Sequence, residues 1–252
     1  MKLSEYQEQA SLLTASLDLS RQPIAVAFCD IVPDAVPNFD GVVPAGCAFW
    51  QEAGTRTFAT SAIDHGMCAI GIHTHNLSDA PASQQEELQS SLQAMIGLDY
   101  VREEEVASIP VAQRQAKRAL YGPLAEFPVD PEIVLLFADA RQGLIVSEAV
   151  ARVDTDIPPA MGRPACAVIP HVLNSGRAAM SLGCCGARAY LDALTDSVAL
   201  WALPGSKLNQ YCGQVEILAL ANKTLSAFHG RRKEDIESGE RPTVEESLQR
   251  LS

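Results

Sequence analysis

Apolar and polar positions in the first half of the chain predict two helices and one buried strand. Residues 3–18 place apolar side chains on one face and charged ones on the other, as in an amphipathic helix. The run at 23–29 is apolar throughout and has the length of a strand, so it predicts a buried strand. Residues 82–96 predict another amphipathic helix, with Ser83 as its cap and Glu86 three residues later. We expect this helix to serve packing.

The second half shows a related pattern. An apolar run at 131–137 predicts another buried strand, and residues 139–152 follow it with helical spacing. A third apolar run at 198–203 predicts a strand that leads into a long helix over about 206–228. Residues 229–252 are strongly charged, which is typical of a solvated surface helix and loop.

These elements predict an α+β fold in which residues 1–252 form a single globular unit. A layout of buried strand, cysteine, gap and glycine-flanked cysteine occurs twice, which indicates two weakly related halves, about 20–125 and 126–228. The cysteines of the two pairs are Cys47 and Cys68, 21 positions apart, and Cys166 and Cys184, 18 positions apart. Two such halves, packed as one unit, would place a metal site at their junction.

The composition limits the class of protein. The chain has 252 residues, of which 47% are hydrophobic, enough for a substantial core. Its net charge is −12 and its only basic run is Arg231-Arg232-Lys233, so we expect no nucleic-acid partner. The opening helix carries charges, and no stretch has the length and apolarity of a membrane span. We therefore expect a cytoplasmic protein with a small-molecule substrate and no membrane partner, and a homo-oligomer stays open.

Seven cysteines in a reducing compartment indicate metal binding, catalysis or core packing before disulfides. Thiolate is a soft ligand, and four thiolates satisfy either zinc or an iron–sulfur cluster. No C-x2-C pair is present to choose between these metals. Cys29 and Cys212 fit the role of small core residues. Glycines on both sides of Cys184-Cys185 would let the backbone approach a bulky inorganic group, and the role of Cys185 stays open.

Other side chains could take part in chemistry at such a site. Asp64 beside His65 is a candidate catalytic pair for proton transfer, because a carboxylate can orient an imidazole. A structural turn with a hydrogen-bonded histidine is the simpler interpretation. His73 and His75 could bind a metal with a third ligand, although a partly exposed loop is the commoner explanation. Arg188 could hold a substrate carboxylate by a bidentate contact or be an ordinary surface arginine.

Several of these residues also carry a resemblance to a known family. They are the strand at 23–28, Gly46-Cys47, Phe58, Cys68, Cys166 and Ser181-Leu-Gly-Cys-Cys-Gly-Ala-Arg188. Over roughly residues 20–225 the chain resembles the archaeal and bacterial conserved-region family called domain of unknown function 169. The resemblance implies that the family's recurring cysteines correspond to Cys47, Cys68, Cys166 and Cys184, and it favours a metal or cluster site there. The chain differs from the usual pattern at Cys185 and directly after Cys68.

These observations lead to the hypothesis of a 4Fe-4S-dependent lyase or hydrolase. Three of the four cysteines would hold the cluster and leave one iron open as a Lewis acid on a small anionic substrate, held by Arg188 or Lys207. The reaction would be desulfurisation, as in a desulfhydrase or desulfidase, or hydrolytic elimination, with the spare thiol or His65 assisting proton transfer. The alternative is a non-catalytic iron–sulfur or metal carrier that uses all four thiolates, and zinc is the alternative metal. A third hypothesis is a metal-free binding domain with the cysteines in its core.

Overall fold

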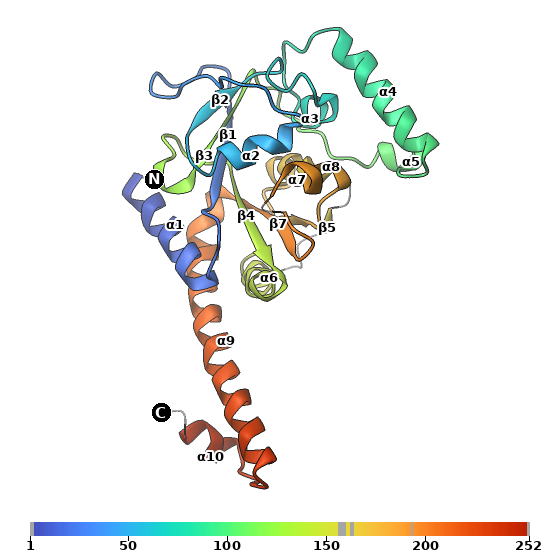
Figure 1. The fold of residues 1–252 in the computed structure, drawn as a ribbon. Coiled ribbons are helices and arrows are strands. Elements are labelled where there is room, and N and C mark those ends of the chain that lie inside the picture. Colours follow the sequence, from blue (N-terminus) through green and yellow to red (C-terminus); the bar gives the residue numbers. More distant parts are fainter. Residues whose placement is uncertain (1–2, 156–159, 162–163, 193, 251–252) are drawn as a thin grey trace.

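The computed structural model describes residues 3–155, 160–161, 164–192 and 194–250, and it shows an α+β fold built on one sheet (Figure 1). The strands are β1 Ile24–Cys29, β2 Phe58–Thr60, β3 Arg118–Pro123, β4 Ile133–Asp139, β5 Ala160–Met161, β6 Ala179–Ser181 and β7 Val198–Pro204. Their order in the sheet is β2-β3-β1-β4-β7-β6-β5. Each neighbouring pair is antiparallel except β5 and β6. The predicted α+β class is therefore confirmed.

Helices cover both faces of this sheet. One face carries α1 Leu3–Leu17, α6 Ala140–Asp154 and the first turns of α9 Leu208–Glu237. The other face carries α2 Phe49–Glu52, α3 Ala69–Thr74, α7 Val168–Ser175 and α8 Cys185–Tyr190. Short 3-10 helices are η1 Gly46–Ala48, η2 Leu124–Glu126, η3 Ala165–Ala167 and η4 Gly205–Lys207. The remaining helices are α4 Ser83–Gly97, α5 Glu103–Val106 and α10 Val244–Gln249.

The central strand β4 shows why both faces of the sheet need a cover. Ile133 and Leu135 belong to the core beneath α2 and α7, whereas Val134 and Leu136 belong to the core beneath α1 and α9. Successive side chains of a strand point to opposite faces, so an uninterrupted apolar run supplies both cores at once. The buried strands predicted from such runs are confirmed, with ends shifted by at most two residues.

The same order of elements occurs twice along the chain. The first stretch runs β1, η1, α2, β2, α3, β3 and η2, and the second runs β4, η3, α7, β6, α8, β7 and η4. In the sheet, β1 and β4 lie side by side at the centre, with β3 and β7 next to them and β2 and β6 beyond. The first stretch also holds α4 and α5, and the second also holds α6 and β5.

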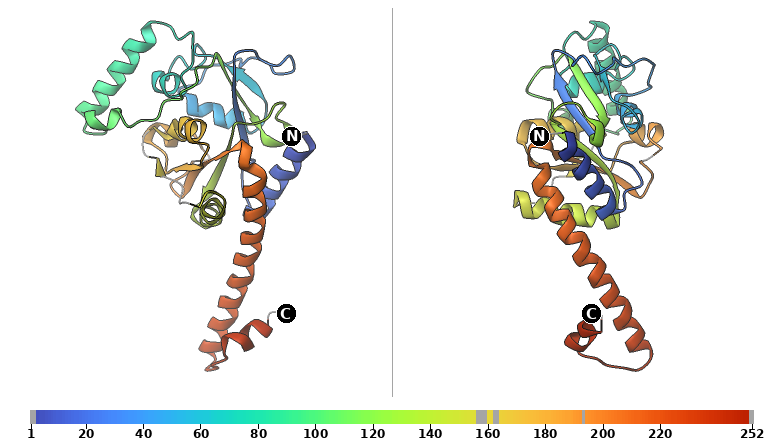
Figure 2. Two further views of the ribbon diagram at one scale, coloured as in Figure 1. Left: turned by 180° about the vertical axis from the view of Figure 1, so that it is seen from behind. Right: turned by 90° about the vertical axis from the view of Figure 1, so that its left-hand side faces the viewer.

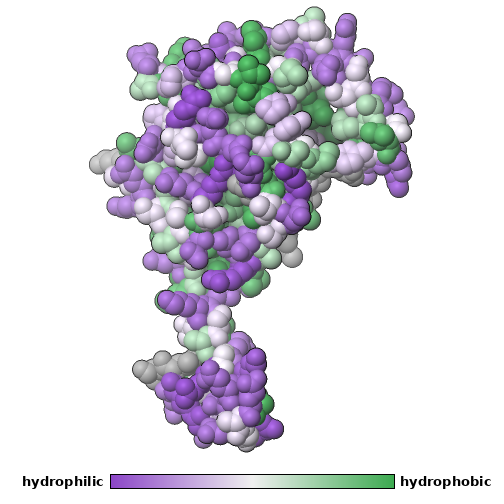
Figure 3. Space-filling model, in the orientation of Figure 1, coloured by the Kyte–Doolittle hydropathy of each residue, from purple (hydrophilic) through white to green (hydrophobic). Residues whose placement is uncertain are grey.

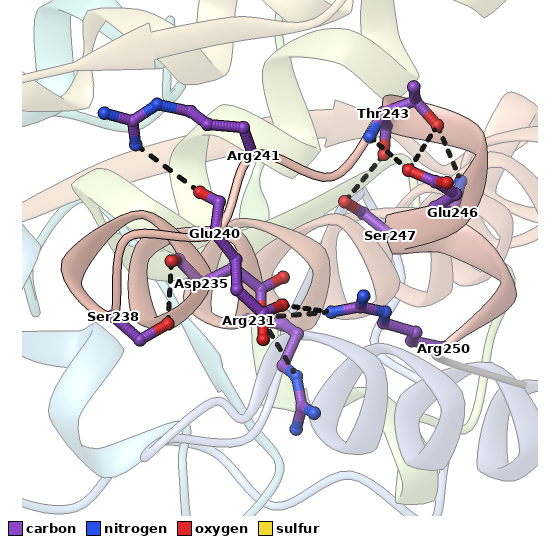
Figure 4. Close-up of polar contacts among 9 residues, drawn as sticks. All are labelled: Arg231, Asp235, Ser238, Glu240, Arg241, Thr243, Glu246, Ser247 and Arg250. Atoms are coloured by element: carbon purple, nitrogen blue, oxygen red, sulfur yellow. Dashed lines mark hydrogen bonds and ion pairs between the residues drawn. The ribbon is translucent and has the colours of Figure 1, made fainter.

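The long helix α9 corrects the predicted boundary of the charged segment 229–252. Its first turns pack against α1 and α6, and it then projects away from the sheet, with α10 beside its far end (Figures 1 and 2). The charges of this part are compatible with a helix because they pair with one another. Asp235 is buried and forms ion pairs with Arg231 of its own helix and with Arg250, which directly follows α10 (Figure 4). In the view of Figure 3 most of the visible surface of this projection is polar, although Leu225, Ile236 and Val244 are exposed apolar residues on it.

Helix α4 confirms the amphipathic helix predicted over 82–96, with a different N-terminus. The cap position is Ala82, and no side chain caps the helix, so Ser83 is not its cap. α4 lies away from the sheet and is joined to the body mainly through α3 (Figures 1 and 2). Across the described ranges, no helix has the length and apolarity needed to cross a membrane.

Candidate metal centre

The four candidate cysteines line one cavity of about 210 Å³ on the α2 and α7 side of the sheet. They are Cys47, Cys68, Cys166 and Cys184. None takes part in a disulfide, and the side chains of Cys47 and Cys184 pack against the same core that contains Cys166. Residues up to 137 positions apart in the sequence are thereby brought to one place.

Equivalent elements of the two stretches position these cysteines. Cys47 is the central residue of η1, and Cys166 is the central residue of η3. Cys68 is the residue directly before α3, and Cys184 is the residue directly before α8. Each stretch therefore contributes one cysteine from a 3-10 helix and one from the start of a short α-helix. The Sγ of Cys184 accepts a hydrogen bond from the Ala187 N–H at 3.4 Å, which fixes its direction.

The thiols influence one another electrostatically. Burial, followed by repulsion from Cys68 and Cys184, raises the pKa of Cys47 to about 12. Burial also raises the pKa of Cys166, and repulsion from Cys68 adds to this effect. The Sγ of Cys166 lies 3.6 Å from Thr74 Oγ1, a contact that lowers the pKa but does not offset burial. Both thiols are therefore protonated near neutral pH unless a cation stabilises the thiolate.

Two glycines leave room for the groups around the cavity. A β-carbon on Gly71 would lie 3.2 Å from Cys68 Sγ and 3.6 Å from His65 Nδ1. A β-carbon on Gly46, the residue before Cys47, would lie 2.8 Å from the same ring nitrogen. Any side chain at these positions would compete for space with the thiol and the imidazole.

Within the described residues, no three His, Cys, Asp or Glu side chains are arranged to hold a single metal ion.

The predicted pair of Asp64 and His65 does not form in the structure. The Asp64 carboxylate accepts hydrogen bonds from the backbone N–H and the hydroxyl of Ser61, both at 2.7 Å. His65 is buried, and its Nε2 lies 3.1 Å from Thr60 Oγ1. The Thr60 hydroxyl donates its hydrogen to the backbone oxygen of Ala119. Its oxygen can therefore accept a hydrogen bond from the Nε2–H of His65. His65 is thus the hydrogen-bonded structural histidine of the simpler interpretation.

His73 and His75 both line the cavity, but only His75 is buried, which corrects the expectation of a partly exposed loop for this residue. It follows α3, lines the cavity and is only 1% exposed, whereas His73 is exposed. Neither ring nitrogen of His75 has a hydrogen-bond partner in the described structure, and its ring packs nearly perpendicular to that of His65, with the ring centres 5.9 Å apart. Burial lowers the pKa of His75 to about 4, so the imidazole is neutral near pH 7.

Arg188 lies outside the cavity lining, so the structure gives it no place for holding a substrate there. Its guanidinium donates hydrogen bonds to the backbone oxygens of Leu182, Leu194 and Thr195. These bonds tie the segment that carries Cys184 to the loop after α8. A substrate carboxylate would have to displace these backbone oxygens, so Arg188 is best described as a clamp of this segment.

Lys207 lies on the opposite side of the sheet from the thiols, so it too is not placed to hold a substrate in the cavity. Its Nζ is 2.7 Å from the Oδ1 of Asp154, and the hydroxyl of Tyr211 donates to the other carboxylate oxygen at 2.8 Å. Asp154 is buried, with 2% of its side chain exposed, so this cluster joins α6 to the start of α9.

The remaining cysteines lie in different surroundings. Cys212 is buried in the core beneath α9, and Cys29 packs against that same core at the end of β1, as the sequence predicted. Cys185 is exposed at the rim of the cavity, and its backbone N–H donates to Tyr100 Oη at 3.3 Å. Sequence reasoning named His75 only as a possible metal ligand in a partly exposed loop, and it did not find Tyr100, which belongs to no motif.

The fold and the cavity define an α+β protein whose sheet carries a site lined by five cysteines, the four candidates and Cys185 at the rim. The model of the domain of unknown function 169 family, described as an uncharacterised ArCR, matches residues 12–214, and the chain belongs to this family. All four candidate cysteines fall inside the matched range, whereas most of α9 and all of α10 lie beyond it. Searches of curated proteins and of solved structures gave no match.

Proposed function

We propose that the protein is an iron–sulfur enzyme in which three of the four candidate cysteines hold a 4Fe-4S cluster. The observation that carries this proposal is the convergence of Cys47, Cys68, Cys166 and Cys184 on one cavity. A cluster held by three thiolates keeps one iron open as a Lewis acid that binds soft sulfur or polarises a leaving group. Desulfurisation, of the desulfhydrase or desulfidase type, and hydrolytic elimination are the reaction classes that follow.

The donor set fits such a cluster better than a single zinc ion. Zinc binds thiolates at about 2.3 Å, so four zinc-binding sulfurs must lie almost in contact with one another. Cluster ligands bind different iron atoms, so their sulfurs are spread more widely around the inorganic core. The described side chains share one cavity without meeting around one point. The repeated order of elements would place the cluster at the junction of two related halves.

The chain's own residues would supply binding, orientation and proton handling. Burial raises the pKa of Cys47 and Cys166, so near neutral pH these thiols release their protons only when a cation is bound. His75 is neutral at pH 7 with free ring nitrogens, so it can accept a proton at the edge of the cavity. It replaces His65, whose Nε2 is engaged by Thr60.

The alternative function is a non-catalytic carrier of a cluster or metal in which all four thiolates are ligands. The near-equivalent placement of the two cysteine pairs supports it, because nothing in that placement marks one thiol as spare. The enzyme hypothesis is favoured because the cavity continues past the thiols to His75 and Tyr100. A carrier needs no such space.

Iron and sulfide analysis of anaerobically purified protein tests both proposals. Each of the four candidate cysteines is replaced by alanine, and Cys212→Ala, in the other core, is the matched control. An enzyme with three cysteine ligands should keep its cluster in one specific variant and lose it in the other three. A four-thiolate carrier should lose iron in all four. Wild-type protein without iron and sulfide, or normal iron content in all four variants, would contradict both.

A further inference from the structure

Part of the cavity that the thiols line is built from the segment around α4 and α5. Three of its side chains, Leu88, Leu92 and Met95, are four and three positions apart and so lie on one face of α4. Val101, Val106 and Ile109, from the segment after α4, complete this part. We call these six residues the apolar wall.

The apolar wall does not belong to either core of the protein. None of its six residues is a member of the two core clusters, although Leu88 and Val101 are buried. The rest of α4 is largely polar and exposed. An amphipathic helix normally turns its apolar stripe towards a core, and here the stripe is turned towards the cavity. The hydrogen bond from the Cys185 N–H to Tyr100 Oη joins this wall to the side that carries the thiols.

The described lining of the cavity contains no Lys or Arg that could neutralise an anion, and of its two histidines only His73 is exposed to solvent. Among the described residues that line the cavity, none is Lys, Arg, Asp or Glu, and the polar ones are cysteines, His73, Thr74, His75 and Tyr100. His75 is neutral at pH 7. A carboxylate placed against the apolar wall would lose its hydration without gaining an ion pair, which is costly. The two basic residues expected to hold an anion, Arg188 and Lys207, are bound to other groups.

We infer that the cavity takes an uncharged, sulfur-bearing small molecule whose sulfur faces the four cysteines and whose hydrocarbon part lies on the apolar wall. The placement of the ligand's sulfur rests on the proposed function, because it requires the cluster. The placement of the ligand's hydrocarbon part rests on the apolar wall alone. Burial of each methylene group on the wall favours binding, and the absence of Lys and Arg from the described lining selects against acidic analogues. The substrate is therefore a neutral thiol or thiocarbonyl compound, not an anionic one.

Two thiols of matched length test this inference on the protein purified anaerobically with its cluster. Butane-1-thiol and 3-mercaptopropionate share the sulfur and the chain length, and differ in whether the far end is hydrocarbon or carboxylate. Binding is followed by the change in the cluster's absorption and electron paramagnetic resonance spectra. We expect butane-1-thiol to bind at least about tenfold more tightly. Equal or tighter binding of 3-mercaptopropionate would overturn the inference.

Two lysine substitutions near the end of α4 locate the hydrocarbon end of the ligand. Met95→Lys puts a charge on the apolar wall, whereas Leu98→Lys is a matched control, because Leu98 is 80% exposed and does not line the cavity. We expect M95K to weaken the binding of butane-1-thiol about tenfold and to reduce or reverse the preference for butane-1-thiol over 3-mercaptopropionate. We expect L98K to bind both thiols as the wild type does. Thermal unfolding and iron content verify that M95K is folded and loaded. A folded, loaded M95K with unchanged preference would contradict the placement.

Failure of this inference and failure of the proposed function give different results. Protein without iron and sulfide contradicts the cluster, whatever the thiols do. Protein that contains the cluster but prefers 3-mercaptopropionate leaves the proposed function intact and contradicts only the neutral, apolar substrate.

Discussion

The Nδ1 atom of His65 lies 2.8 Å from the position that a β-carbon on Gly46 would occupy. The ring cannot move aside easily, because its Nε2 is hydrogen-bonded to Thr60 and its centre lies 4.6 Å from the ring centre of Phe49. Gly46 also precedes Cys47 directly, so a displaced backbone would carry a thiol with it. A glycine is therefore required here for close approach.

Gly46→Ala should accordingly lower the free energy of unfolding by roughly 1–3 kcal/mol through overpacking and should reduce the iron content. Urea unfolding and iron analysis measure the two effects. Gly213→Ala is the control: it lies inside α9, where a β-carbon meets nothing within 4 Å, so it should stabilise the protein by about 0.5–1 kcal/mol. A G46A variant as stable and as iron-rich as wild type would show that the cavity is not tightly built at this point.

His75 should make the protein less stable in acid. Its pKa is about 4 in the folded state against 6.5 for the free side chain, so the unfolded chain binds a proton that the folded chain excludes. Stability is then complete above about pH 6.5 and is lost as the pH falls towards 4. At pH 5 this one group should cost roughly 2 kcal/mol relative to pH 7.5. Burial lowers the pKa of His65 as well, so it acts in the same direction.

The comparison that isolates this effect is His75→Gln against His229→Gln, because His229 is exposed on α9. Urea unfolding at pH 5 and 7.5 should show a smaller loss of stability in acid for H75Q than for wild type. H229Q should match wild type. An identical pH dependence in all three proteins would mean that His75 is solvated and does not face a dry cavity.

The expectation that distant cysteines share one site rested on a repeated layout and a family resemblance, whereas three of the seven strands of the described sheet were predicted from strong local signals. Uninterrupted apolar runs marked β1, β4 and β7. β3 was missed because Gly122 and Pro123 interrupt its run, and yet Gly122 is required there: a β-carbon would lie 2.2 Å from Thr57 Oγ1. Such a requirement depends on a neighbour far along the chain and is invisible locally.

The roles of single polar residues were harder to predict, because they depend on what tertiary structure places beside them. Arg188 follows the cysteine motif closely enough to suggest substrate binding, but its partners are backbone oxygens. His75 was expected in a partly exposed loop, but in the structure it directly follows α3 and is buried. The spacing of Leu88 and Leu92 predicted a helix but did not predict that its apolar face borders a cavity rather than a core.

Lys207 should contribute to the stability of the fold and not to ligand binding in the cavity. Burial acts to raise the pKa of Asp154, but hydrogen bonds from Lys207 and Tyr211 outweigh burial, so the net pKa is lowered. Lys207→Met removes the cation and leaves a buried carboxylate, which should cost roughly 2–4 kcal/mol. Lys233→Met, in an exposed pair with Glu237, should cost less than about 0.5 kcal/mol. The iron content and the preference between butane-1-thiol and 3-mercaptopropionate should be unchanged in both variants. A selective loss of 3-mercaptopropionate binding in K207M would instead show that Lys207 binds the anion.

Arg188 offers the sharpest distinction between a clamp and a substrate ligand. A guanidinium can reach several backbone oxygens at once, whereas the single ammonium of lysine cannot hold the same geometry. Arg188→Lys should therefore loosen the segment that carries Cys184 while keeping the positive charge. We expect iron to be released to a chelator several-fold faster than from wild type, with the preference between the two thiols unchanged.

The matched control for this experiment is Arg241→Lys, since Arg241 donates to the Glu240 backbone oxygen in the C-terminal segment, beyond the part matched by the family (Figure 4). It should release iron at the wild-type rate. Retention of iron in R188K together with weaker binding of 3-mercaptopropionate alone would place the guanidinium on a substrate carboxylate. Faster release with unchanged preference would instead follow from the three backbone oxygens, because loss of their bonds frees Cys184 without altering the charge near the apolar wall.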